Sequence, residues 1–169
     1  DALRVGAIGF STSRANTHIT PDGTPVPSRI AEWNELDRLV AAMAEMNAGV
    51  FQIGPDISSG SAYKKFLQQL KKICLDNGRP VMFGVSSTRQ GEDPLPWQQQ
   101  LDLIDEVVAA GGKMWGQATT RAINAIFSAK SYLPFDTLPA WSEIRGLSIE
   151  NQKAQFADPE VRRRLIADE

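Results

Sequence analysis

Short apolar stretches alternate with longer, periodically apolar segments through residue 117 of the chain. The short stretches cover residues 7–10, 50–53, 80–83 and 113–117, and each has about the length of a strand. In the longer segments between them, apolar residues recur every three or four positions, which is typical of amphipathic helices. This order predicts an α/β fold in which parallel strands are joined by right-handed βαβ crossovers.

The three expected helices carry start and stop signals. Asn34 is predicted to cap the first helix, and Gly78 to end the second. The third is expected to open near Pro96 and to end at the glycines of residues 111–112. The residues predicted to face the core are Leu36, Leu39, Val40 and Met43 in the first helix, Tyr63, Phe66, Leu67, Leu70, Ile73 and Cys74 in the second, and Trp97, Leu101, Ile104 and Val108 in the third.

A parallel sheet needs cover on both faces and both edges. For a sheet of four strands, this chain can supply that cover only in part. Part of a (β/α)8, TIM-like barrel therefore explains the pattern better than a complete small fold. Past residue 120 the alternation stops: residues 122–130 are predicted to be helical, and Ser148 and Asp158 to cap two further helices. We expect a partial barrel over residues 1–121, then a helical insertion or lid over residues 122–169.

Composition and charge narrow the function classes. The chain has 169 residues, with 18 Lys+Arg against 20 Asp+Glu, and a net charge of −2 provides no broad basic surface for nucleic acid.

No apolar run approaches the roughly 20 residues of a membrane-spanning helix. Cys74 is the only cysteine, so a disulfide within the chain is impossible and a reducing, cytoplasmic location is expected. Residues 1–7 resemble the last turn of a longer helix, and we expect a piece of a longer protein.

Candidate binding residues cluster at the expected carboxyl ends of the strands, where parallel α/β folds bind ligands. Three of these ends carry hydroxyl side chains followed by an arginine, a combination that can hold a carboxylate or a phosphate. The alternative is that they are ordinary polar loop residues with solvated arginines. The candidate substrate-binding residues are Ser11, Ser13, Arg14, Gln52, Ser86, Arg89, Gln117 and Arg121.

No metal site and no catalytic residue can be assigned from the residues alone. His18, the only histidine, lies in a polar loop and is either a lone acid–base group or a bystander. Asp56 either orients a substrate or belongs to a turn. Cys74 lies on an apolar helix stripe, where an inert core thiol is expected. Trp115 is the tryptophan most expected to line a pocket, because it lies on a strand.

Residues 6–13, Gly-Ala-Ile-Gly-Phe-Ser-Thr-Ser, resemble a strand of the N-acyl-D-amino-acid deacylases, which belong to the amidohydrolase superfamily. The order of the segments that follow also resembles this family, namely residues 25–28, 50–53, 79–83, 105–111, 134–135, 139–141 and 158–162. The resemblance implies that the chain supplies the fourth to seventh strands of a distorted (β/α)8 barrel and part of a helical insertion near its site.

The resemblance also implies a function. The parent protein would hydrolyse a C–N amide bond of a small N-acylated, D-amino-acid-like substrate with a zinc-activated water, and an arginine of the candidate set would bind the substrate carboxylate. Gly54 and Val85 stand near the expected metal-binding histidines, so this segment alone is expected to bind no zinc and to be inactive. One alternative is a non-catalytic barrel relative that binds a small ligand or a protein partner. The other is a self-contained flavodoxin-like binding module.

The partners expected from this reading are a small-molecule substrate and the remaining part of the barrel. Assembly of the chain into a homo-oligomer is left open. Neither nucleic acid nor a membrane is expected as a partner.

Overall fold

The computed structural model describes residues 1–20, 22–56, 59–85, 97–122, 124, 126–131, 133–136 and 138–168. It divides into two compact units, Asp1–Thr120 and Arg121–Glu169, whereas the sequence analysis placed the boundary after residue 121. The elements of the first unit are, in chain order, the 3₁₀ helix η1 (Ala2–Val5), β1 (Gly9–Ser13), α1 (Pro27–Ile30), α2 (Trp33–Glu45), β2 (Val50–Gly54), α3 (Gly60–Asn77), β3 (Val81–Gly84), α4 (Trp97–Ala109) and β4 (Met114–Gln117).

The four strands form one parallel sheet in the order β1-β2-β3-β4. Phe10 pairs in register with Phe51, which pairs with Val81, which in turn pairs with Met114. Helices lie between successive strands, so the predicted α/β class and its βαβ units are confirmed.

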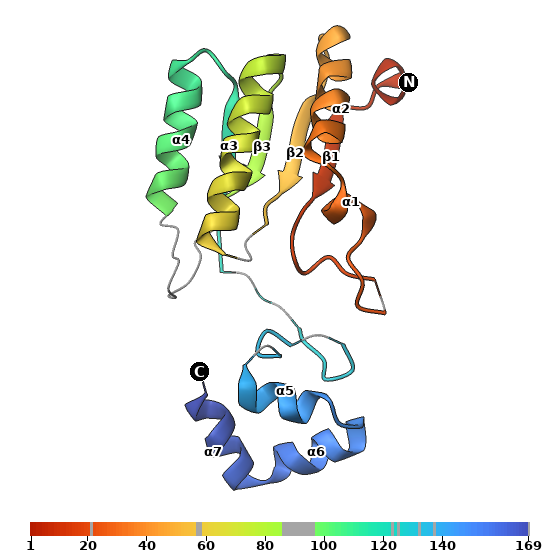
Figure 1. Cartoon of the computed structure of the whole chain (residues 1–169), viewed down its shortest axis with the longest axis vertical. Helices are drawn as coiled ribbons and strands as arrows, with labels where there is room; N and C mark the ends of the chain where they lie inside the picture. Colours follow the sequence, from red (N-terminus) through yellow and green to blue (C-terminus); the bar gives the residue numbers. More distant parts are fainter. Residues whose placement is uncertain are drawn as a thin grey trace. The chain divides into compact units, whose positions relative to one another are not determined.

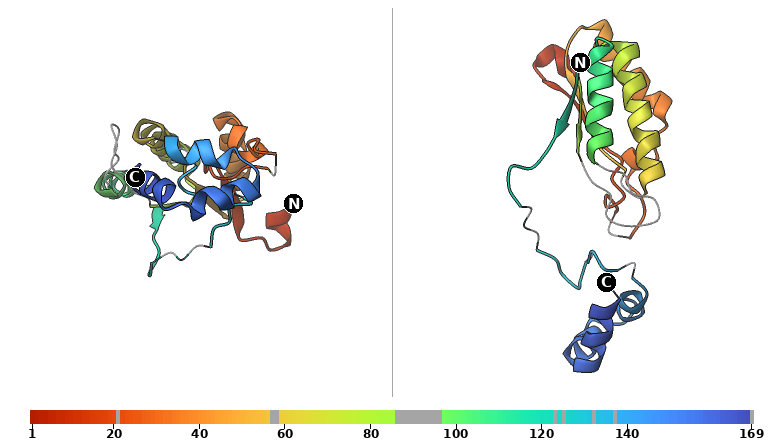
Figure 2. Two further views of the ribbon diagram at one scale, coloured as in Figure 1. Left: turned by 90° about the horizontal axis from the view of Figure 1, so that it is seen from below. Right: turned by 90° about the vertical axis from the view of Figure 1, so that its left-hand side faces the viewer.

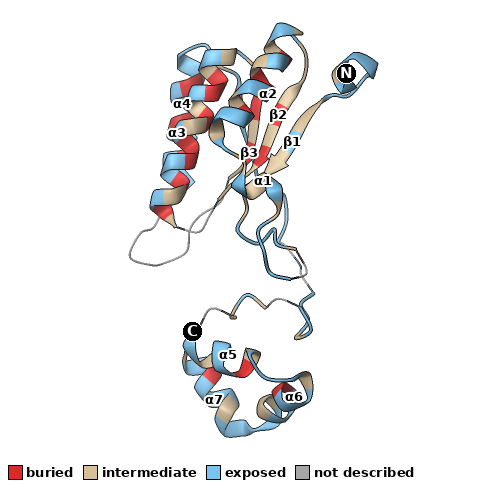
Figure 3. Ribbon diagram, turned by 45° about the vertical axis from the view of Figure 1, so that its right-hand side comes forward, coloured by how far each residue is buried: buried red, intermediate tan, exposed pale blue. Residues whose placement is uncertain are grey.

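Helices α2, α3 and α4 all cover the same face of this sheet (Figures 1 and 2). Right-handed crossovers that always step in one direction along a sheet put every helix on one side. A doubly wound, flavodoxin-like sheet reverses direction once and has helices on both faces. Figure 3 shows the buried residues of the helices turned toward the sheet. The core of this unit consists of Leu36, Val40, Met43, Phe51, Ile53, Tyr63, Phe66, Leu67, Leu70, Ile73, Cys74, Val81, Phe83, Leu103, Val107 and Met114.

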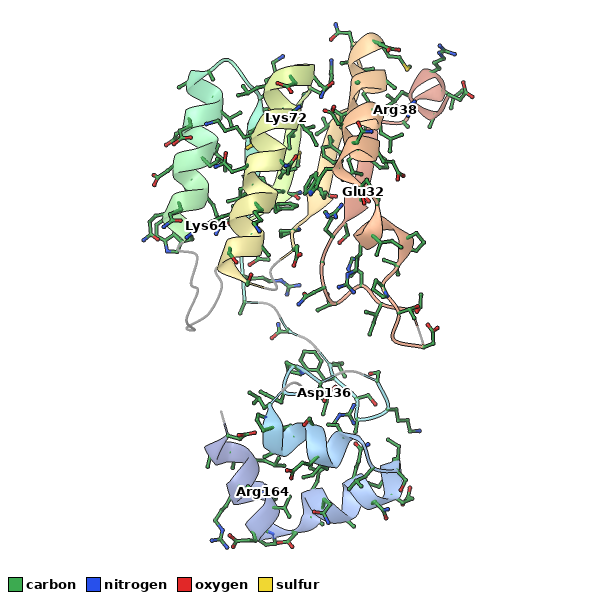
Figure 4. All side chains as sticks on the ribbon, viewed as in Figure 1. Glu32, Arg38, Lys64, Lys72, Asp136 and Arg164 are labelled. Carbon is green, nitrogen blue, oxygen red and sulfur yellow. The ribbon has the colours of Figure 1, made fainter. Side chains whose placement is uncertain are left out.

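Helix α3 forms as its sequence predicts. All six residues expected on its buried stripe are buried. The Ser59 side chain caps its first turn by accepting a hydrogen bond from the Ala62 N–H, and Gly78 ends it with a left-handed φ of 62°. On the solvent side of the same helix, Lys64 and Lys72 are exposed (Figure 4).

Three details of the first two predicted elements are wrong. Strand β1 runs over Gly9–Ser13 and not over residues 7–10, because a turn with φ of 107° at Gly6 delays its start. Helix α2 begins one residue before Asn34, which therefore lies inside the first turn and is not the cap. Leu39 is 42% exposed, since the buried stripe of α2 is narrower than the apolar pattern suggests.

The predicted stripe of α4 is also wrong. Gln100, Leu103 and Val107 are buried, whereas Trp97, Leu101 and Val108 are 51%, 41% and 52% exposed; Ile104 packs partly buried against the core. Gln100 faces inward because it has a buried polar partner, the Tyr63 hydroxyl at 2.8 Å. Apolar periodicity contains no information on such a buried polar pair. The stripe predicted from it is therefore the neighbouring one.

The second unit contains α5 (Pro139–Arg145), α6 (Ile149–Ala157) and α7 (Pro159–Ala167). Ser148 and Asp158 cap α6 and α7 as predicted. The helix predicted over residues 122–130 is absent from the described residues of that range: Ile126 and Phe127 are 102% and 52% exposed, and a short helix without a surface to bury its apolar side chains is unstable in water.

Arg145 connects the segment before α5 to the helices of this unit. Its guanidinium pairs with Asp136 at 2.6 Å and donates to the carbonyls of Ala129 and Ser131 and to the Gln152 side chain; Figure 4 labels Asp136. The Arg145 side chain is only 11% exposed, so this network is largely withdrawn from water. Among the described residues of the whole chain, no helix combines the length and apolar character needed to cross a membrane.

The burial of α4 leads to a stability prediction. Leu103→Ala removes a buried side chain and is expected to lower the free energy of unfolding by about 2–5 kcal/mol. Leu101→Ala, on the same helix but 41% exposed, should cost less than about 1 kcal/mol. Urea denaturation followed by circular dichroism measures both, and equal losses would contradict the orientation of α4.

Candidate functional site

The sheet face opposite the helices carries a row of uncharged side chains. Strand residues alternate between the two faces, so Ser11, Gln52, Met82 and Trp115 share one layer of this face. The next layer, at the carboxyl ends of the strands, contains Ser13, Gly54, Gly84 and Gln117. We call the six side chains of these two layers the open-face row: Ser11, Ser13, Gln52, Met82, Trp115 and Gln117.

A chain of hydrogen bonds crosses this row. The Ser11 hydroxyl donates to Gln52 Oε1, and Gln52 Nε2 donates to Gln117 Oε1 at 3.4 Å. The second bond is long, because Gln52 and Gln117 lie on strands β2 and β4 and reach each other across β3. The row therefore joins three of the four strands by neutral groups that both donate and accept.

Glycines occupy the carboxyl ends of the two central strands. Gly54 and Gly84 have no side chain in the layer between Ser13 and Gln117. At Gly54 a Cβ atom would lie 2.7 Å from Ser13 Oγ, so the Ser13 side chain leans over this glycine. The group that approaches the backbone at Gly54 is thus Ser13. At Gly84 a Cβ atom would meet only Pro55 Cδ, at 3.7 Å, so Gly84 is the position in this layer where a ligand group can approach the backbone.

A cavity of about 290 Å³ opens on the same face toward the amino ends of the strands. It is lined by Ile8, Gly9, Phe10, Ser11, Val50, Gln52 and Met82. Ser11 and Gln52 thus belong both to this cavity and to the hydrogen-bonded row. Trp115, 50% exposed on the neighbouring strand, adds a flat apolar surface.

The structure brings together Ser11, Gln52 and Gln117 of the candidate substrate-binding residues, and Ser13 lies on the same face. Arg14 differs. Its guanidinium donates to the Ala31 carbonyl at 2.6 Å and lies 4.7 Å from the centre of the Trp33 ring, which packs against the core on the helix side. The Arg14 guanidinium therefore holds the segment before α2 and does not face the open-face row.

Five further candidates are not among the six side chains that define the open-face row. Arg121 is exposed and is the first residue of the second unit, and Ser86 and Arg89 are outside the described residues. His18 is exposed in the loop after β1, beside the isolated bridge between Ile19 and Pro25. Asp56 lies two residues beyond the end of β2.

The described residues do not fit the zinc ion that the family resemblance implies. No group of three or more His, Cys, Asp or Glu side chains in this part of the chain could hold a metal ion. A histidine in place of Gly54 would have to displace Ser13, and the Val85 side chain packs against Gly116 on the helix side of β4. The amide and hydroxyl oxygens of the row are not the nitrogen and sulfur ligands that zinc prefers.

Cys74 is a core residue, as the sequence predicted. Its Sγ is buried, 3.5 Å from the Lys113 carbonyl oxygen. Burial raises the pKa of this thiol above its ordinary value, which keeps it protonated near neutral pH. It therefore serves neither as a nucleophile nor as a zinc ligand in this fold.

Comparisons with known proteins add no family assignment. No protein-family model matches the chain, and neither the curated proteins nor the solved structures contain a significant match to it. The geometry of the open face is thus the main evidence on function.

Sequence reasoning missed Met82 and the two glycines of the carboxyl-end layer. Alternation along residues 80–83 contains the signal for Met82, because it lies between Val81 and Phe83, which are both buried on the other face. The roles of Gly54 and Gly84 depend on strand register, which pairs each of them with a specific neighbour and which the sequence does not state.

The placement of Arg14 predicts a structural role. Arg14→Lys removes the contact with the Trp33 ring and the planar donor to Ala31, and should lower the free energy of unfolding by about 1–2 kcal/mol. Arg38→Lys, an exposed substitution on α2, should change it by less than about 0.5 kcal/mol. Thermal or urea denaturation distinguishes the two, and an Arg14 variant as stable as the control would argue against this role.

Proposed function

We propose that the chain forms part of the wall of a (β/α)8 barrel, with the open face turned toward the barrel interior. The sequential order of four parallel strands and the helices on a single face support this arrangement. In such barrels the helices form the outer ring and the other sheet face lines the centre. The second unit, with its three helices, would be the helical insertion of the same protein.

The exposed face supports the same proposal energetically. Parallel sheets are normally covered on both sides, yet Val50 and Met82 are only partly buried and Trp115 is half exposed. Among the strands of the described residues, β1 and β4 each have one neighbour, which leaves one edge of each available for pairing. About four more strands close a barrel of eight and remove both edges.

We propose further that the parent protein hydrolyses a C–N amide bond of a small N-acylated, D-amino-acid-like substrate, and that this segment contributes to substrate binding. The resemblance of residues 6–13 to the N-acyl-D-amino-acid deacylases supports the reaction type. The observation that carries the proposal is the hydrogen-bonded row of Ser11, Gln52 and Gln117 on the face that would line the barrel. In this proposal the groups that activate water come from parts of the barrel beyond β1–β4.

A second candidate function is binding without hydrolysis. Gly54 and Val85, at the positions where the resemblance leads one to expect metal-binding histidines, favour it. A barrel that has lost these ligands could keep the neutral row and bind a small ligand or a protein partner. A location in the cytoplasm remains part of either proposal, supported by a single cysteine that is buried and reduced.

Assay of the full-length parent protein on a panel of N-acyl-D-amino acids, with metal analysis of the purified protein, separates the two functions. We expect turnover of at least one member of the panel, with the isolated 169-residue chain inactive as the matched control. Turnover abolished by chelation and restored by metal would support the hydrolase. If the parent protein shows no turnover and contains no bound metal, the hydrolase proposal is rejected and the binding function is left.

A further inference from the structure

We infer that the open-face row selects an uncharged amide group of its ligand and excludes carboxylates. This inference rests on the proposed function, because it assigns a part of the substrate to the site. It differs from the sequence-based expectation, in which an arginine near these strands binds the substrate carboxylate.

The orientation of the Gln52 amide is fixed by its neighbour. Gln52 Oε1 accepts the Ser11 hydroxyl hydrogen, so its Nε2 group points onward as a donor toward Gln117 Oε1. Between these two atoms the row thus presents a donor facing an acceptor. A ligand amide has the complementary pair, a carbonyl oxygen and an N–H, on opposite sides of one planar group.

The length of the Gln52–Gln117 hydrogen bond favours insertion of such a group. At 3.4 Å it is near the limit for a hydrogen bond, and an amide that enters between the two side chains replaces one long bond with two of ordinary length. Gly84, directly beside Gln117 on β3, leaves room for the incoming group. Trp115, on the same face two residues before Gln117, offers a surface for an adjoining apolar substituent.

Charge argues against a carboxylate at the same place. A carboxylate has acceptors only, so it can bind both glutamines only if Gln117 turns its amide over. Even then, no side chain of the row is a cation. Among the described cations nearest to the row in the sequence of the first unit, Arg14 is engaged on the helix side. Lys113 lies one residue before β4 and four residues before Gln117, a rise of about 13 Å along an extended chain. Removing an anion from water without a positive partner is unfavourable.

The test is a titration of the 169-residue chain, labelled with ¹⁵N, against N-methylacetamide and against acetate as matched small probes. The side-chain amide signals of Gln52 and Gln117 and the indole signal of Trp115 report on the row. We expect saturable shifts with N-methylacetamide and a Kd for acetate at least tenfold higher. Equal affinity, tighter acetate binding, or no saturable shift with either probe would overturn the inference.

Substitutions at Gln117 test whether N-methylacetamide binds at the open-face row. Gln117→Glu, which is nearly isosteric but negative, and Gln117→Leu, which is neutral, should each raise the Kd for N-methylacetamide at least tenfold. Gln98→Glu adds the same charge at an exposed position of α4 and should leave it within twofold. Well-dispersed spectra verify that each variant is folded. Unchanged affinity in both Gln117 variants would contradict the assignment to this row.

The parent protein separates failure of this inference from failure of the proposed hydrolysis. If the parent hydrolyses N-acyl-D-amino acids and Gln117→Leu leaves its KM unchanged, the hydrolase stands and the inference is wrong. If the parent has no turnover but the chain prefers the amide probe, the inference stands and binding without hydrolysis is the function.

Discussion

The direction in which the chain crosses between strands determines the rest of the structure. Each of β1, β2 and β3 is followed by a helix and then by the next parallel strand on the same side, and right-handed crossovers put all of these helices on one face. That face becomes the core, with Phe51, Ile53 and Phe83 fully buried against the helices. On the opposite face no helix of the described residues packs, and this leaves the open-face row uncovered by the described part of the unit.

The two faces of the sheet have different roles, packing on the helix side and proposed binding on the open side. On the helix side, the buried Tyr63 hydroxyl pairs with Gln100, and this bond specifies how α3 and α4 pack against each other. On the open side, Ser11, Gln52 and Gln117 pair with one another through groups that can equally pair with a ligand. Stability therefore depends on residues that are separate from those assigned to binding, and the two can be tested by different substitutions.

The sequence predicts the helices and strands of the first unit well, but it predicts poorly which side chains of some helices are buried. Strands and the long helix α3 follow from clear periodicities and from the stop signal at Gly78. The orientation of α4 does not, because the burial of Gln100 depends on a partner 37 positions away in the sequence. The helix expected over residues 122–130 is missing from the described residues of that range, where Ile126 and Phe127 stay exposed and supply no packing energy for a short helix.

The candidate site shows the same limit. Ser11, Gln52 and Gln117 can be chosen from their places near strand ends, but that they form one row depends on strand register. Arg14 was chosen by the same rule, yet it follows Ser13 directly and alternation turns it to the helix side, where Trp33 and the Ala31 carbonyl bind it. Charge at a strand end is therefore a weaker guide to a binding site than the face on which the residue lies.

The most direct test of the central claim is a crystal structure of the full-length parent protein. The proposal predicts further parallel strands paired to the free edges of β1 and β4, with Gln52 and Gln117 facing an enclosed interior. A helix packed on the open face, or an antiparallel strand at either edge, would contradict it.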